Sequence, residues 1–307
     1  MRHTAIILAI SASVLLCGCS GGTTPVQTAT PTMPPGTTPT TTPAPPARIP
    51  NVMGNWQFKA TSDNTGTRPF TIAGSLSQSG GSMGQNGPAV TGTFHVDGSN
   101  CFDRLITRGF TGTLTGVSTS LTVMGTDGQV VTITGDFDHD EMYYGTVVTD
   151  TFNGSYTING GCASGDHGTI TGSYIDSVAR PSDPTTLKGT FSNSSGQQIF
   201  HVTGNIVQSA SVSREGSFAF TGTAAFDLPC LGAGTIKPGG YPSASFILGT
   251  SVGLEFDTSN GILTLIGTLN PGKREIVGNY TVSGGSCNDS GTAVLSLSSA
   301  GLGYWDY

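Results

Sequence analysis

Charged side chains are scarce in this chain. They make up 10% of its 307 residues, and 12 lysines and arginines stand against 19 aspartates and glutamates, for a net charge of −7. The basic residues are spread along the sequence and form no cluster. Because phosphate binding requires a clustered positive surface, this distribution argues against nucleic acid as a partner.

Long apolar segments are also missing. The apolar stretch from Ala5 to Leu16 is shorter than the ~20 residues that a membrane-spanning helix needs. Beyond it, no window combines the apolar repeat of a helix with helix-capping residues. We therefore expect neither a membrane-spanning helix nor a helical domain.

Catalytic signatures are thin. Segments 80–84 and 249–253 match the Gly-x-Ser-x-Gly pattern of serine nucleophiles, but that chemistry needs a helix after the serine, and neither segment is followed by one. No histidine of the domains has a histidine partner at metal-ligand spacing, the four being His95, His139, His167 and His201. We expect no enzymatic site and no cofactor.

The densest acidic segment spans residues 136–141. Its carboxylates are those of Asp136, Asp138, Asp140 and Glu141, and oxygens at alternate positions suit Ca²⁺. The segment is not an EF-hand loop, because Glu141 stands at the required glycine and Val147 at the required final glutamate. We expect a solvated hairpin tip without a metal, and these four carboxylates are the ligand candidates should a cation bind.

The N-terminus carries a processing signal. A short basic start precedes the apolar stretch, and segment 16–19 reads Leu-Cys-Gly-Cys. This arrangement resembles the signal and lipobox of bacterial lipoproteins. The resemblance implies that residues 1–18 are a signal peptide, that Cys19 carries the lipid, and that the protein is anchored in the cell envelope. Ser20 favours the outer membrane, and an ordinary cleaved secretory signal is the alternative.

A tether follows the lipobox. Residues 23–50 are almost entirely threonine, proline, alanine and glycine, and the run from Pro31 to Pro46 carries no charge. Such a segment cannot build a core and favours an extended polyproline II conformation. We interpret residues 19–50 as a spacer between the membrane and the folded part.

The remaining sequence is duplicated. Three phrases recur in the same order in both halves, at Gly74 and Gly204, at Thr91 and Thr221, and at Gly154 and Gly278. We therefore predict two β domains, residues 51–179 and 187–307, joined by a proline-containing linker at 180–186.

Each half contains two cysteines in matching places. Cys101 and Cys162 are 61 residues apart, and Cys230 and Cys287 are 57 residues apart. An exported compartment permits disulfides, so we predict one bond within each copy. A zinc site built from all four is the alternative, although no two of them have the short spacing that zinc sites favour.

Both halves alternate apolar residues with threonine and serine, which predicts half-buried strands. In the first half we expect strands near 54–61, 70–78, 89–96, 109–115, 119–126, 130–137, 142–158 (one strand or two) and 168–175. A meander of about eight strands removes its edges by closing into a barrel. The predicted fold is all-β, two tandem antiparallel up-and-down barrels, with a β-sandwich as runner-up.

Phrases such as Gly54-Asn-Trp56 and Thr171-Gly-Ser-Tyr174 resemble those of avidin-type and lipocalin-type barrels. The resemblance implies a ligand pocket lined by tryptophan. The domains offer Trp56 and the C-terminal Trp305, and Phe191 stands at the place of Trp56 in the second copy. Trp56 is thus the candidate ligand-binding residue, although interior aromatic side chains more often belong to the core.

These observations lead to an expected function. We expect a lipid-anchored envelope protein with a structural, adhesion or protein-interaction role and no catalysis, whose partner is an unidentified protein or glycan. The alternative is binding of a small ligand or carbohydrate inside a barrel, which would require an open interior beside Trp56.

Overall fold

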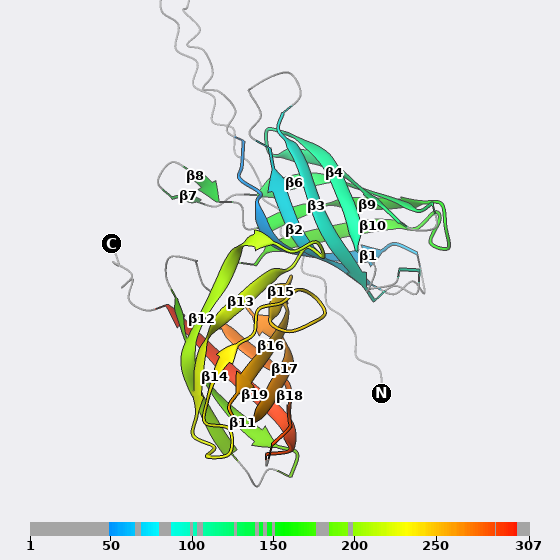
Figure 1. The fold of residues 1–307 in the computed structure, drawn as a ribbon. Coiled ribbons are helices and arrows are strands. Elements are labelled where there is room, and N and C mark those ends of the chain that lie inside the picture. The colour runs from blue at the N-terminus through cyan, green and yellow to red at the C-terminus, as the bar shows by residue number, and fades with distance from the viewer. Residues whose placement is uncertain are drawn as a thin grey trace, which may run out of the picture. The chain divides into compact units, whose positions relative to one another are not determined.

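The computed structural model describes residues 49–299, except 65–68, 80–86, 99–100, 103–106, 126–127, 139–140, 144–145, 149–150, 176–183, 196–198 and 286. Within these residues every regular element is a β-strand (Figure 1). None of the described residues forms a helix that is long and apolar enough to cross a membrane.

The first half closes into an antiparallel barrel. Its strands are β1 (Gly54–Ser62), β2 (Phe70–Gln78), β3 (Ala89–Asp97), β4 (Arg108–Thr115), β5 (Ser118–Met124), β6 (Val130–Asp138), β9 (Thr151–Asn159) and β10 (His167–Tyr174). Each strand pairs with the next one along the barrel, and β10 returns to pair with β1. The connection between β6 and β9 contains a separate hairpin, β7 (Glu141–Tyr143) and β8 (Thr146–Val148).

The second half repeats this topology. Its strands are β11 (Thr185–Asn193), β12 (Ile199–Val212), β13 (Phe218–Phe226), β14 (Ala233–Ile236), β15 (Phe246–Leu248), β16 (Ser251–Thr258), β17 (Gly261–Asn270), β18 (Glu275–Ser283) and β19 (Asp289–Ser299). The sheet closes because β12 pairs with β11 on one side and with β13 on the other. Strands β14 and β15 both lie between β13 and β16, so together they take the place of one strand.

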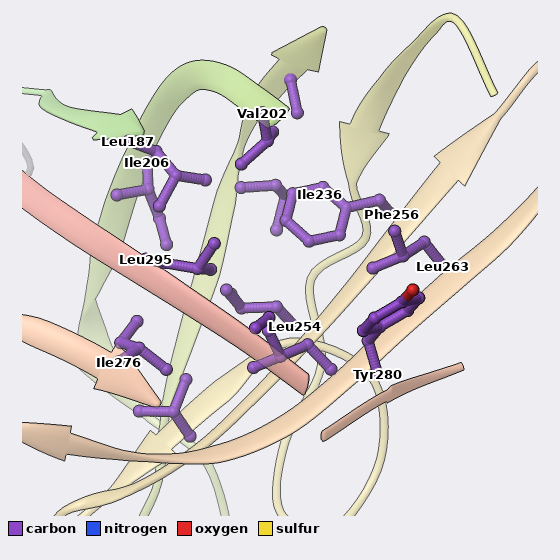
Figure 2. Close-up of a cluster of buried hydrophobic side chains, with 14 of the residues drawn as sticks. Leu187, Val202, Ile206, Ile236, Leu254, Phe256, Leu263, Ile276, Tyr280 and Leu295 are labelled. Atoms are coloured by element: carbon purple, nitrogen blue, oxygen red, sulfur yellow. The ribbon is translucent and has the colours of Figure 1, made fainter. Parts of the chain in front are cut away.

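The strands form because their sequences alternate with period two. In β4, Phe110 and Leu114 are buried while the threonines between them face outward. The same alternation gives each barrel its own buried cluster of apolar side chains. Figure 2 shows this core in the second barrel, where Leu254, Phe256 and Ile276 converge with side chains from other strands. Fully burying one such side chain contributes ~1.5–3 kcal/mol.

The predicted fold class is confirmed. The described strands are all antiparallel, and closure of both sheets decides for barrels over a sandwich. Each barrel has one disulfide, Cys101–Cys162 in the first and Cys230–Cys287 in the second, as the matched separations predict.

The repeated phrases occupy equivalent places in the two barrels. Gly74 pairs with Phe94 in the first barrel, and Gly204 pairs with Ala224 in the second. Gly154 and Gly278 likewise face glycines of the preceding strand. The correspondence of the two halves therefore extends from sequence to strand register.

Two expectations need correction. Segment 142–158, predicted as one strand or two of the barrel, joins the barrel only from Thr151, because the residues before it form the separate β7–β8 hairpin. Phe191 is not the counterpart of Trp56. Trp56 lies opposite Gly74, and Leu187 lies opposite the equivalent Gly204, so Leu187 takes the place of Trp56. Gly54 and Gly189, which lie two residues before Trp56 and Phe191, stand at different positions of the equivalent strands β1 and β11.

Candidate interaction surface

Trp56 is a core residue of the first barrel. Its side chain is fully buried, and its Nε1 donates a hydrogen bond of 2.9 Å to the carbonyl oxygen of Val52. Its ring lies 5.6 Å from that of Phe58, 5.3 Å from Phe137 and 5.7 Å from Tyr174, measured between centroids. Aromatic side chains thus surround Trp56 on several sides and pack against it.

The second barrel is filled in the same way. Phe191 stacks on Phe200 with centroids 4.7 Å apart, and the ring of Tyr280 stands edge-on to both. Phe256 packs at a right angle to Phe226, with centroids 5.4 Å apart. The inner faces of both barrels therefore serve packing.

Two buried tyrosines occupy equivalent places in the barrels. The hydroxyl of Tyr156 donates to Oδ2 of Asp166 at 3.0 Å, and that of Tyr280 donates to Oδ2 of Asp289 at 2.7 Å. Burial raises the pKa of Tyr156 to about 12, and the hydrogen bond to Asp166 adds to the rise. Burial and Asp289 raise the pKa of Tyr280 too. Both phenols stay protonated at neutral pH and act as donors that hold a strand end.

The acidic segment is only partly described. Asp136 and Asp138 are exposed residues of β6 itself, and Ser118 donates a hydrogen bond of 2.6 Å to Oδ1 of Asp136. Asp140 lies outside the described residues, and the side chain of Glu141 does as well. Among the residues that the structure describes, no group of three or more histidine, cysteine or acidic side chains is arranged to hold a metal.

Other candidates also lie beyond the described part. They are the lipobox with Cys19, the tether up to residue 48, and the C-terminal segment with Trp305. The predictions made for them stay predictions.

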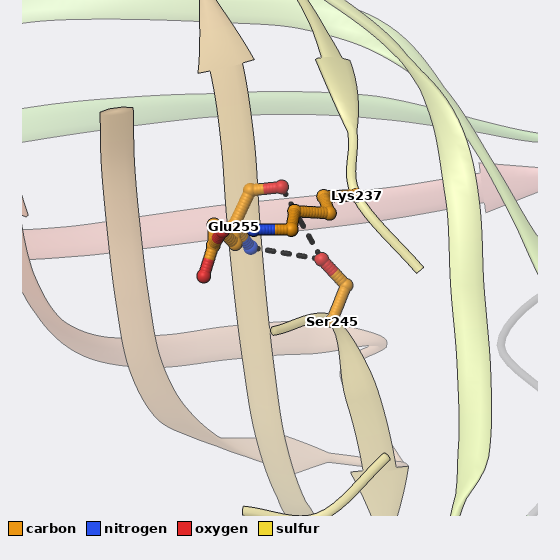
Figure 3. Close-up of polar contacts among 3 residues, drawn as sticks. All are labelled: Lys237, Ser245 and Glu255. Carbon is orange, nitrogen blue, oxygen red and sulfur yellow. Dashed lines mark hydrogen bonds and ion pairs between the residues drawn. The ribbon is translucent and has the colours of Figure 1, made fainter. Parts of the chain in front are cut away.

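Charged contacts on the second barrel gather over β12 to β16. His201 Nδ1 lies 2.8 Å from Oδ2 of Asp227 on the surface, and the backbone N–H of His201 lowers the pKa of that carboxyl. Lys237 donates to Oε1 of Glu255 at 2.7 Å, and the backbone N–H of Glu255 donates to the Ser245 hydroxyl at 2.8 Å; these residues are drawn in Figure 3. The Glu255 carboxylate raises the pKa of Lys237.

One outer face of the first barrel is already occupied. Asn55 of β1 is buried, and its side-chain amide donates to the carbonyl oxygen of Gly249 at 2.8 Å and accepts from the Gly249 N–H at 2.7 Å. The N–H of Thr250 donates to Oε1 of Gln57 at 3.2 Å. The β15–β16 turn of the second barrel is thus held by two amide side chains of the first.

A second contact belongs to the same junction. Nε2 of the buried His95 on β3 lies 2.7 Å from the carbonyl oxygen of Glu215, in the β12–β13 turn. The His95 ring also lies 4.7 Å from that of Tyr241. The outer face of β1 to β3 is therefore a docking surface for turns of the second barrel.

The second barrel has an outer face without charged side chains, which we name the neutral face. It lies over β11, β19, β18 and β17, and strand register aligns its members in three rows across the strands. The rows are Thr190, Val294, Val277 and Thr268; Ser192, Thr292, Asn279 and Ile266; and Ser194, Ser290, Thr281 and Thr264. Three aliphatic side chains stand exposed among hydroxyls, with exposed fractions of 55% for Ile266, 50% for Val277 and 45% for Val294.

An open, shallow groove of about 790 Å³ lies over the β11, β19 and β18 members of the last two rows of the neutral face. The exposed Ile266, Val277 and Val294 lie beside it and are not part of its lining. Of the residues that line it, all except Gly291 carry a hydroxyl or a carboxamide. A second open groove, of about 530 Å³, lies over β12 to β16 and includes the carboxylate of Asp257. The hydroxyl and carboxamide side chains of the 790 Å³ groove donate and accept hydrogen bonds without bearing charge.

The equivalent face of the first barrel has a different chemistry. Register places Lys59 at the position of Thr190, Asp136 at that of Thr268 and His167 at that of Ser290. The positions of Val277 and Val294 hold Asn153 and Thr171. The neutral face is therefore a property of the second barrel alone, although the two barrels share one fold.

Sequence reasoning did not find the neutral face. Its alternating threonines and serines were visible in each strand, but which residues of different strands share a row depends on register. A sequence signal existed in the absence of charge at outward positions of segments 262–268 and 276–282.

Comparisons with known proteins do not assign the chain to a family. No family description and no curated protein matches it. Among solved structures, kievitone hydratase from Nectria haematococca aligns over 82% of this chain and 91% of its own, with 11% identity and a TM-score of 0.21. The agglutinin of Burkholderia oklahomensis aligns over 80% and 96%, with 14% identity and a TM-score of 0.16. At these TM-scores neither similarity carries an argument about fold or function.

Proposed function

We propose that this protein is a non-catalytic binding module of the cell envelope that contacts its partner through an outer barrel face. The observation that carries the proposal is the contrast between the filled barrel interiors around Trp56 and Tyr280 and the exposed, hollowed neutral face. Buried aromatic side chains in mutual contact leave the barrel walls as the surface on which recognition can occur.

The expected anchor fits this role. Lipid on Cys19 and the extended spacer up to residue 50 would hold the barrels away from the membrane, where their outer faces meet other molecules. The contact between Asn55 and the Gly249 turn supports the same idea, because it is a case in which an outer face of one barrel binds another surface.

The anchor is tested by Cys19→Ala. We expect the wild-type protein to partition into the detergent phase on extraction of membranes and the variant to move to the aqueous phase, since a single acyl group contributes about 0.8 kcal/mol per buried CH₂. Recovery of the variant in the detergent phase would place the anchor elsewhere.

Native mass spectrometry of the purified protein tests the barrel interiors. A small molecule retained in stoichiometric amount would favour the alternative function, ligand binding inside a barrel.

A further inference from the structure

We propose that the neutral face binds a neutral glycan, with sugar rings lying along β19 across Thr292 and Val294. This inference rests on the proposed function and names the chemical class of the partner. The neutral face is exposed, hollowed by a groove of about 790 Å³, and built from outward side chains of four neighbouring strands.

Charge selects the class of partner. The twelve positions of the neutral face contain no ionisable side chain, although the row beyond Val294 begins the charged border with Lys188 and Glu275. A ligand that covers this face removes no charge from water, which would otherwise cost several kcal/mol for each unpaired group. An anionic polymer would find no cation on the face itself, so an uncharged partner is favoured.

The polar groups suit a polyol. Ser192 and Thr292 lie side by side across β11 and β19, and Thr292 also faces Asn279 on β18. Each hydroxyl can donate and accept, and the carboxamide of Asn279 does both through separate atoms. Sugar hydroxyls have the same dual capacity, so a chain of them can pair with this row in several registers.

The aliphatic side chains suit the other surface of a sugar. Val277 and Val294 face each other across β18 and β19, and Ile266 lies in the next row beside Asn279. Sugar rings present C–H groups on their faces, and removing such apolar area from water favours binding. A protein partner is less favoured here, because the face has no aromatic or arginine side chain of the kind that anchors protein interfaces.

The first barrel provides an internal control. The residue equivalent to Thr292 is Thr169 of β10, which pairs with Ser155 and Thr61 as Thr292 pairs with Asn279 and Ser192. Both threonines are exposed. An arginine at either site adds the same charge and bulk to the same kind of strand, but only one of them lies on the neutral face.

The experiment is affinity electrophoresis of the full mature protein in gels that contain a panel of neutral polysaccharides, with dextran and dextran sulfate as a matched uncharged and anionic pair. We expect at least one neutral polysaccharide to retard the wild type, and Thr292→Arg to weaken that binding at least tenfold. Thr169→Arg should bind as the wild type does, and Thr292→Ser should retain binding because the hydroxyl is kept. Circular dichroism melting curves of all variants establish that they fold.

Three results with the variants and the dextran pair overturn the proposal. They are equal binding by Thr292→Arg, equal losses in Thr292→Arg and Thr169→Arg, and a preference for dextran sulfate. If the protein binds none of the neutral polysaccharides but still captures a protein partner through an outer face, the glycan proposal is rejected and the proposed function stands. Retention of a stoichiometric ligand inside a barrel would instead reject the proposed function.

Discussion

Tyr156 and Tyr280 tie the barrel wall to the strand that follows the disulfide-bonded loop. Asp166 also accepts hydrogen bonds from the Ser62 hydroxyl and, at 3.1 Å, from the Asn64 side chain, so the tyrosine joins three segments through one carboxylate. The second barrel keeps the tyrosine–aspartate pair with Asp289. A phenol works in this position because its ring fills the core while its hydroxyl reaches the polar end.

The raised tyrosine pKa values predict a loss of stability at alkaline pH. An unfolded tyrosine ionises near pH ~10, whereas folded Tyr156 holds its proton to about 12. The stabilisation is therefore fully present below pH ~10 and falls as the pH rises from there toward ~12. We expect the melting temperature of the wild type to fall more steeply over this range than that of Tyr156→Phe with Tyr280→Phe. Parallel curves for the two proteins would contradict the argument.

Two turns of equivalent topology differ in their surroundings. Gly116 in the β4–β5 turn and Gly249 in the β15–β16 turn both have positive φ, of 61° and 56°. A Cβ on Gly116 would meet nothing within 4 Å, whereas a Cβ on Gly249 would lie 2.1 Å from Oε1 of Gln57 and 2.8 Å from Cβ of Ala73. The turn of the first barrel thus has open space beside it, whereas the equivalent turn of the second barrel lies against β1 and β2 of the first barrel.

Alanine substitutions at Gly116 and Gly249 measure separately the cost of a left-handed backbone and the cost of a steric clash with the first barrel. Gly116→Ala should cost ~1–2 kcal/mol, the penalty of the left-handed conformation for a side chain. Gly249→Ala should cost a further ~1–3 kcal/mol, because the methyl group overlaps the junction. Urea unfolding of both variants gives the two free energies. Equal losses of unfolding free energy in the two variants would mean that the contact with the first barrel accommodates a methyl group without cost.

At the level of the assembled chain, the junction couples two separately filled cores. Asn55 contributes both a donor and an acceptor to the Gly249 peptide, and the contact is buried. Removing one partner leaves the other without its hydrogen bonds, which costs ~1–3 kcal/mol for each buried group. We therefore expect the two barrels to unfold together.

The test compares Asn55→Ala with Thr186→Ala, the control in the second barrel. The two positions are equivalent because Thr186 lies opposite Asn205, as Asn55 lies opposite Ser75. We expect calorimetry to give one unfolding transition for the wild type. Asn55→Ala should lower the free energy of unfolding by ~2–4 kcal/mol, and Thr186→Ala by ~0.5 kcal/mol or less. A stable Asn55→Ala protein with an unchanged transition would show that the junction contributes nothing.

Local pattern was sufficient for much of the architecture. Alternation of apolar residues with threonine determines which residues face inward, and this rule predicted the first-half strands to within a few residues, except before Thr151. The duplicated phrases and the cysteine spacings predicted the disulfides Cys101–Cys162 and Cys230–Cys287, because equivalent positions in two copies of one fold bring the same pairs together. The lipobox and the proline-rich tether are likewise local signals, and the anchoring they predict awaits the Cys19 experiment.

Register, closure and docking required long-range contacts. Whether Trp56 lines a pocket or fills a core depends on Phe137 and Tyr174, which arrive from strands far along the chain. The amide pairing between Asn55 and Gly249 spans 194 residues and has no local signature. The neutral face exists because four strands align uncharged outward positions in common rows. A strand's sequence sets which side chains point out, but the register with its neighbours sets which of them stand together.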